Sequence, residues 1–153
     1  MNLRIAQESD LAELAELFRQ SVLSTAPQRY TPEQTQAWAS LADGDRFRQL
    51  ILQPITYVLI DDTGILGFAG IADDGYVAST YVRSDCIHQG LGSKLMQAIL
   101  EHAHRNKIQR LYAEASEFSL GLFKKYGFHL YDTEVVERHS VPFKRYLVER
   151  YQV

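Results

Sequence analysis

The stretch YVRSDCIHQGLGSKLMQAIL, from Tyr81 to Leu100, determines how the rest of the chain is interpreted. A β-branched, apolar run ends at Val82. Gly90 and Gly92 follow, one residue apart, where a helical apolar stripe begins. Glycine in a helix costs about 1 kcal/mol relative to alanine, so its use here needs a reason. Either the turn is merely tight, or another group approaches the main chain closely.

A glycine pair between a strand and a helix is typical of anion binding. The first turn of a helix leaves about four N–H groups unpaired and carries about half a positive charge, and glycine lets an anion reach them. Lys94 opposes the helix dipole unless an anion lies nearby. Two familiar phosphate motifs do not fit, because Leu95 stands where a dinucleotide fingerprint needs glycine and GLGSKL lacks the P-loop spacing. A glycine turn packed tightly on a neighbour is the alternative.

The composition indicates an ordinary globular protein. The 153 residues are 46% hydrophobic and 23% charged, with a net charge of -3, which predicts one domain over residues 1–153. The acidic balance disfavours a nucleic-acid partner, and no apolar run is long enough to predict a membrane span. The N-terminus does not resemble a signal peptide, and the lone Cys86 excludes an internal disulfide. We therefore expect a cytoplasmic protein in which Cys86 is a packing residue.

Hydrophobic periodicity predicts a single domain of mixed α/β class. Thr31 and Gln34 have the spacing of a capping box, and Leu91, Leu95 and Ile99 begin one helix stripe. The predicted helices cover 9–22, 31–40, 45–52, 91–105 and 116–127. The predicted strands cover 3–6, 55–61, 65–73, 76–82 and 108–115, followed by a hairpin of 128–139 and 143–151 around Ser140–Pro142.

Two segments together resemble the GCN5-related N-acetyltransferase (GNAT) superfamily. YVRSDCIHQGLGSKLM resembles its acetyl-CoA-binding segment, whose signature is [Q/R]-x-x-G-x-[G/A]. Gly90 and Gly92 match the last two fixed positions, and Ile87 stands where the family has Gln or Arg. AEASEFSLGLFKKYGF resembles the family's strand, short helix and Gly-Phe, and RYTPEQTQAW and VERHSVPFKRYLVE resemble a subgroup of small bacterial acetyltransferases. The resemblance implies a mostly antiparallel, twisted sheet of about seven strands, splayed between the fourth and fifth and flanked by helices.

The resemblance implies acetyl-CoA as co-substrate. In the family, main-chain N–H groups of the glycine loop hold the pyrophosphate, and the end of the preceding strand bonds the pantetheine and the acetyl carbonyl. The cofactor-contacting residues implied here are Tyr81, Val82, Ile87, His88, Gln89, Gly90, Leu91, Gly92, Ser93, Lys94, Ser116 and Phe123.

The implied reaction is direct attack of a primary amine of a small molecule on the thioester in a ternary complex, without a metal or a covalent enzyme intermediate. Tyr76, an ordered water and Glu114 are the candidates for the base, with a solvated strand end as the alternative for Glu114. Ser116 replaces an Asn common at its position and can bond the pantetheine or a water. Phe123 stands at the family's tyrosine position, so Tyr126 is the candidate acid.

The family's acceptor pocket lies between the first helices and the final hairpin. This implies Tyr30, Gln34 and Trp38 as substrate-binding residues, with a core role as the alternative for Trp38. Arg138 and His139 are expected in a solvated turn. No histidine spacing predicts a metal site.

Two other functions stay open at this point. One is a protein acetyltransferase acting on a lysine or an N-terminus, and the other is a non-catalytic acyl-CoA-binding regulatory module. The acceptor amine and the length of the acyl group are also open. A homodimer is common in the family.

Overall fold

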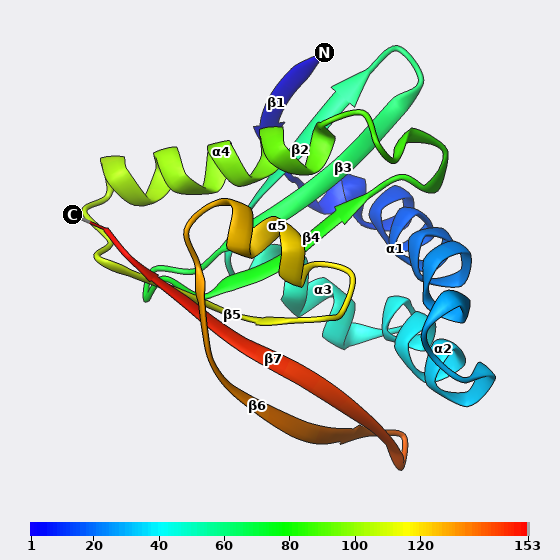
Figure 1. The fold of residues 1–153 in the computed structure, drawn as a ribbon. Coiled ribbons are helices and arrows are strands. Elements are labelled where there is room, and N and C mark those ends of the chain that lie inside the picture. Colours follow the sequence, from blue (N-terminus) through cyan, green and yellow to red (C-terminus); the bar gives the residue numbers. More distant parts are fainter. Residues whose placement is uncertain (153) are drawn as a thin grey trace.

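The structure, a computed structural model that describes residues 1–152, confirms the mixed α/β architecture with seven strands in the described chain. One antiparallel sheet has the order β1-β2-β3-β4 and the other the order β5-β7-β6 (Figure 1). The strands are β1 (Asn2–Ile5), β2 (Ile55–Asp61), β3 (Gly64–Ile71), β4 (Val77–Val82), β5 (Arg110–Ala115), β6 (His129–Arg138) and β7 (Val141–Tyr151).

Helices pack on both faces of the first sheet. Because side chains alternate along a strand, Tyr57 and Leu59 of β2 face one cluster and Val58 faces the other. The cluster around Val58 includes residues of α1 (Leu11–Thr25), α2 (Pro32–Ala39) and α3 (Asp45–Leu52), and the cluster around Tyr57 includes residues of α4 (Leu91–Arg105) and α5 (Leu120–Lys125). Short 3-10 helices cover Glu8–Asp10, Ala26–Gln28, Ser40–Ala42 and Ser84–Cys86.

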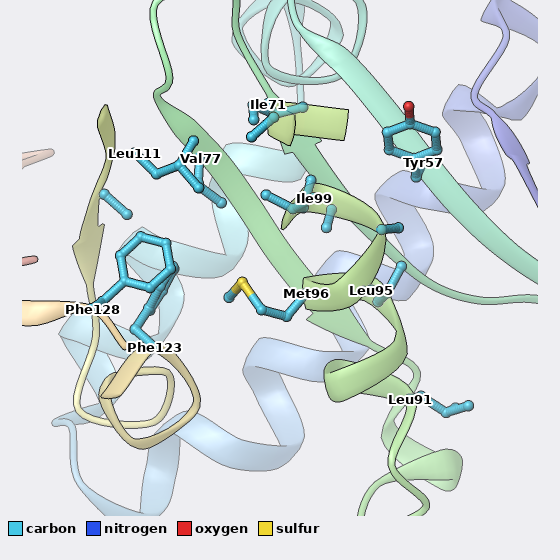
Figure 2. Packing of buried hydrophobic residues seen from close by; sticks show 14 of the residues in the cluster. Tyr57, Ile71, Val77, Leu91, Leu95, Met96, Ile99, Leu111, Phe123 and Phe128 are labelled. Carbon is cyan, nitrogen blue, oxygen red and sulfur yellow. The ribbon is translucent and has the colours of Figure 1, made fainter. Parts of the chain in front are cut away.

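The helix α4 lies across the sheet with the predicted stripe turned inward. Leu91, Leu95, Ile99 and Ala103 are all buried, and Met96 beside them is fully enclosed (Figure 2). The bounds of α4 are those that the hydrophobic periodicity of the sequence predicts. The glycine loop therefore precedes a helix that is fixed by the core, which holds the N-terminus of α4 in a defined place.

The first and second sheets diverge between β4 and β5. An isolated parallel bridge between Tyr76 and Tyr112 joins them at one end, where the Tyr112 N–H donates to the Gly75 carbonyl at 3.1 Å. In the pairing of β3 with β4, Gly70 is opposite Ser79 but Ile71 is opposite Val77. The extra residue is Ala78, and such a bulge increases local twist and bends a strand. The predicted splay between the fourth and fifth strands is confirmed.

The final hairpin turns earlier than the sequence suggests. His139 and Ser140 have φ values of +51° and +62°, as a two-residue turn with two left-handed positions requires. Val141 and Pro142 consequently belong to β7, with Pro142 opposite Glu137. The predicted turn around Ser140–Pro142 is therefore displaced, because the left-handed turn residues are not the glycines that usually mark such turns.

Within residues 1–152, none of the helices combines the length and the apolar character needed to cross a membrane.

Candidate active site

A cavity of about 330 Å³ occupies the divergence between β4 and β5. One end lies at the glycine loop, where Ile87 and Gly92 line it. The other end lies between α2 and the β6–β7 hairpin, where Trp38 and Phe143 line it. A single cavity therefore connects the predicted anion site with the predicted acceptor pocket.

The strand β4 presents unpaired main-chain groups to this cavity. The Arg83 N–H donates to the Leu66 carbonyl at 2.8 Å. In an antiparallel ladder the hydrogen-bonded residues alternate, so Tyr81 directs its main chain towards β3. Thr80 and Val82 alternate with Tyr81 along the strand, so their main-chain N–H and carbonyl groups are directed away from β3, towards the divergence. Of the predicted pair, Val82 can offer main-chain bonds there, whereas the Tyr81 main chain is directed towards β3 and its contact with the cofactor stays a prediction.

The glycine loop has the geometry that an anion site needs. Gly90 has φ +77°, a left-handed conformation that favours glycine. The Lys94 N–H makes the first helical bond, to the Gly90 carbonyl at 3.1 Å, which leaves the N–H groups of Leu91, Gly92 and Ser93 outside the helical ladder. An added Cβ on Gly92 would lie 3.4 Å from Leu122 Cδ2 and project where the cavity opens.

A lysine other than Lys94 lies at this helix terminus. The Lys94 ammonium is directed at Met1 Sδ, 3.7 Å away, on the exposed side. From α5, the Lys125 ammonium donates to Ser93 Oγ at 3.2 Å. Sequence reasoning selected Lys94 because it is local and missed Lys125, which the packing of α5 brings to the loop.

The remaining predicted cofactor residues fall into two groups. Ile87 is 49% exposed at the cavity mouth, and His88 has φ +62°, so the loop turns sharply before Gln89. By contrast, Leu91 is the first residue of α4 and its side chain is buried in the core. Phe123 is also buried, lines the cavity, and packs edge-on against Phe128 with ring centroids 5.0 Å apart (Figure 2). Leu91 can thus contribute its main chain, and Phe123 contributes an apolar wall.

Glu114, near the end of β5, places a carboxylate in the middle of the cavity lining. Its Oε1 lies 3.6 Å from Arg145 Nη1. Its Oε2 is buried and has no hydrogen-bond partner within residues 1–152. A buried carboxylate oxygen without a partner is costly and is suited to accept a proton or bind a cation that enters the cavity.

Tyr76 lies at the closed end of the divergence and stacks at an angle on Tyr112, with ring centroids 5.3 Å apart. Burial raises the pKa of Tyr76 first, and the neighbouring Glu114 carboxylate raises it further. A phenol with a raised pKa stays protonated at neutral pH. At neutral pH Tyr76 is therefore better suited to donate a proton than to accept one, and its role as a base stays a prediction.

Ser116 and Tyr126 also differ from their predicted roles. Ser116 Oγ accepts the N–H groups of Phe118 and Ser119, each at 3.2 Å, so it holds the turn that leads into α5. Tyr126 packs on the core cluster of α4, with the Lys125 ammonium 5.6 Å from its ring centroid. Ser116 still lines the cavity, but Tyr126 lies outside its lining, so we no longer consider Tyr126 as the acid.

The acceptor end of the cavity has an aromatic wall. Tyr30 packs edge-on against Trp38, and Phe143 from the hairpin lies 6.0 Å from the Tyr30 ring. The Trp38 indole N–H donates to the Tyr81 hydroxyl at 3.2 Å. Burial raises the pKa of Tyr81 to about 12, so this phenol is neutral. The structure brings Tyr30 and Trp38 together, as the sequence predicts, and adds Tyr81, Phe118 and Phe143.

Gln34 has a structural role. Its Oε1 accepts the Thr31 N–H at 3.0 Å, and Thr31 Oγ1 accepts the Gln34 N–H at 3.1 Å, which confirms the capping box. Its Nε2 donates to the Pro142 carbonyl at 2.8 Å. Both ends of the amide are thus occupied, so Gln34 fixes the hairpin against α2. These bonds do not favour the predicted contact of Gln34 with substrate, which stays a prediction.

Several polar residues of the lining were missed as site residues, and three of them bear on the chemistry. Ser79 is 7% exposed, and its Oγ has no hydrogen-bond partner within the described residues. Arg138 and Arg145 reach the cavity from the hairpin. Arg138 is half-buried and is the last residue of β6, so the expectation of a solvated turn is wrong for it, because the turn begins at His139. The sequence shows that this hairpin carries charged residues. The strand register that directs Arg138 and Arg145 towards the cavity depends on residues far apart in the chain, so no local pattern reveals it.

Across residues 1–152, no group of three or more His, Cys, Asp or Glu side chains has a metal-binding arrangement.

The fold and the glycine loop agree with a known family of acetyltransferases. A family model described as an acetyltransferase (GNAT) domain matches residues 26–149. The chain therefore belongs to the GNAT acetyltransferase family, as the glycine loop suggested.

Individual proteins agree with this assignment. The chain is 25% identical over 146 residues to YafP of Escherichia coli strain K12, an uncharacterized N-acetyltransferase, covering 95% of this chain and 93% of that one. A GCN5-related N-acetyltransferase structure from Rhodopseudomonas palustris, also described as an aminotransferase, class-II, superposes with a TM-score of 0.93 at 23% identity, over 99% and 95% of the two chains. The PaiA N-acetyltransferase of Thermoplasma acidophilum in complex with coenzyme A gives a TM-score of 0.78 at 18% identity, over 99% and 100%.

Proposed function

We propose that this protein is a single-domain enzyme over residues 1–153 that transfers an acetyl group from acetyl-CoA to a primary amine of a small molecule. The single observation that carries the proposal is the continuous cavity between β4 and β5, with a glycine-framed helix terminus at one end and the Glu114 carboxylate in its lining. A volume of about 330 Å³ suits a small ligand. The structural relative bound to coenzyme A supports the choice of co-substrate.

The residues present fit acetyl-CoA. The free N–H groups of Leu91, Gly92 and Ser93, together with the Lys125 ammonium, supply positive potential for a pyrophosphate. The unpaired main chain of Val82 can bond the amide-rich pantetheine arm. Phe123 and Leu122 supply an apolar wall for the thioester.

In the proposed reaction the amine nitrogen attacks the thioester carbonyl carbon in a ternary complex. The C–N bond forms, the C–S bond breaks, and the thiolate leaves with the electron pair. Glu114 takes the amine proton, directly or through one water, because it lines the cavity and its buried Oε2 has no hydrogen-bond partner among the described residues. Holding both reactants in one cavity supplies much of the rate enhancement.

Two alternatives are less well supported. A protein acetyltransferase needs room for a polypeptide, whereas Gln34 fixes the hairpin against α2 and the aromatic wall narrows this end. A non-catalytic acyl-CoA-binding module does not need a buried, unpartnered carboxylate. The absence of a metal, a cytoplasmic location, a homodimer and the absence of nucleic-acid or membrane partners stay predictions.

The test is a coupled assay for free CoA thiol with acetyl-CoA and a panel of primary amines, with mass spectrometry of the products. We expect thiol release that depends on the amine and yields the N-acetyl product. Acetyl-CoA binding without transfer to any amine would favour the non-catalytic module. Acetylation of peptides but of no small amine would favour a protein acetyltransferase.

A further inference from the structure

Arg138 is an unusual residue in this cavity because its charge is not neutralised. It is half-buried in the lining and forms no ion pair within residues 1–152. Burial lowers the pKa of Arg138, and the positive charges of Arg145 and Arg46 lower it further. A half-buried guanidinium among other cations is unfavourable unless an anion joins it.

The neighbouring Arg145, unlike Arg138, has its charge neutralised. Arg145 forms ion pairs with both Glu114 and Glu134. It therefore positions the Glu114 carboxylate and is itself neutralised. Lys144, the other cation of the lining, is exposed, with its ammonium 5.3 Å from the centroid of the Tyr146 ring. Arg138 is thus the cation of the lining that is both partly desolvated and unpaired among the described residues.

A second observation points to a polar ligand in the same cavity. Ser79 Oγ is buried and has no hydrogen-bond partner in the described chain, and Ser79 lines the cavity with Arg138. A hydroxyl that loses water without gaining a partner is costly. A ligand with acceptor oxygens would satisfy both the Ser79 hydroxyl and the Arg138 guanidinium.

We propose that the acceptor is an amino acid, whose carboxylate binds Arg138 while its amine faces Glu114. The planar guanidinium matches a carboxylate with two parallel hydrogen bonds. A single unpaired positive charge balances a monoanion, whereas a phosphate dianion would also be repelled by Glu114. The inference rests on the proposed acetyltransferase activity and names the substrate class of that site.

The experiment compares matched acceptors in the thiol-release assay. The panel pairs each common L-α-amino acid with its α-carboxamide, 4-aminobutyrate with butylamine, and alanine with 1-aminoethylphosphonate. We expect the wild type to prefer carboxylates by about 10- to 100-fold in kcat/KM, the range for a hydrogen-bonded charge pair. A preference for α-amino acids or for ω-amino acids will define the distance between the carboxylate and the amine of the acceptor. Equal use of carboxamides, or preference for the phosphonate, would overturn the inference.

Variants assign the effect to Arg138. Arg138→Gln should lower kcat/KM about 10-fold or more for carboxylate acceptors, chiefly through KM, and leave neutral amines unchanged. Arg138→Lys should recover part of the loss. Arg29→Gln, which removes an exposed charge outside the lining, is the matched control. An equal loss for charged and neutral acceptors in Arg138→Gln would contradict the proposal.

Two further readouts separate the possible failures. Thermal unfolding of each variant shows whether it is folded, and calorimetry with acetyl-CoA shows whether the co-substrate site is intact. No acetyl-CoA binding by the wild type would overturn the proposed function, and this inference with it. Binding together with acetylation of neutral amines only would overturn the amino-acid acceptor alone. Calorimetry of N-acetyl-amino acids with CoA present should show binding that Arg138→Gln weakens.

Discussion

The Lys125 ammonium lies 3.2 Å from the Ser93 hydroxyl and joins the end of α5 to the first turn of α4. A cation beside a helix N-terminus opposes the helix dipole. The contact is therefore favourable when an anion binds beside both the ammonium and the helix N-terminus. This relationship makes the N-terminus of α4 a two-element site, formed by a loop and by a distant short helix.

Substitution Lys125→Gln should weaken acetyl-CoA binding by about 10-fold, the loss expected for one charge-assisted hydrogen bond. Its binding should also depend less on salt than that of the wild type. Calorimetry at two ionic strengths measures both effects. Lys124→Gln, on the same helix and exposed, is the control and should bind normally. Equal weakening in the two variants would indicate a general charge effect.

Substitution Glu114→Gln should lower kcat by about 100-fold or more, because it removes the proposed proton acceptor. The acetyl-CoA dissociation constant should stay unchanged, since Glu114 lies away from the glycine loop. Steady-state kinetics and calorimetry separate the two quantities. Glu137→Gln, on the exposed part of β6, serves as the control. A variant with wild-type kcat would exclude Glu114 as the base.

Substitution Tyr81→Phe removes the acceptor of the Trp38 indole N–H. Leaving that donor without a partner should lower the free energy of unfolding by about 1–2 kcal/mol. Urea denaturation measures this change, with Tyr131→Phe, at an exposed ring, as the control. Since Tyr81 and Trp38 line the acceptor end, KM for the amine should rise. An unchanged KM would indicate that this pair is structural only.

The stability of the fold should depend on pH through His102. Its Nδ1 lies 2.7 Å from the Tyr57 hydroxyl, and burial, then Arg105, lowers the pKa of His102, against a smaller opposing effect of Asp73. The unfolded chain binds this proton near the ordinary value of 6.5, whereas the folded chain binds it only at lower pH. Folding stability is therefore fully present above pH about 6.5 and falls as pH drops towards the lowered pKa.

Thermal unfolding of wild type, His102→Gln and His104→Gln between pH 5 and 8, the range in which histidine titrates, tests this dependence. The His102 variant should not show the decline in folding stability below pH about 6.5. The His104 variant, exposed on the same helix, should keep it. The same decline in all three proteins would place its origin elsewhere.

Elements with strong local signals could be predicted from the sequence. α4 has the predicted bounds because its apolar residues recur at helical spacing and a glycine precedes it. The Thr31–Gln34 capping box is likewise a local pattern. The seven strands followed from the apolar and alternating runs, whereas the antiparallel arrangement and the splay followed from the family resemblance, since no local pattern encodes the pairing of β5 with β7.

The errors in the site have a common physical origin. Lys125 reaches the glycine loop through the packing of α5, and Arg138 and Ser79 reach the cavity through the hairpin register and a bulge in β4; none of these is a local property. Gln34 was assigned to substrate from its helix face, and the bond of its amide to the hairpin carbonyl of Pro142 is likewise not a local property.

The most direct test of the central claim is calorimetric titration of acetyl-CoA into the wild type, Gly92→Glu and Gly121→Glu. Gly92 borders the cavity at the α4 terminus, whereas an added Cβ on Gly121 meets no atom within 4 Å. The account predicts micromolar binding by the wild type and Gly121→Glu, and loss of binding in a folded Gly92→Glu. No binding by the wild type, or unchanged binding by Gly92→Glu, would contradict it.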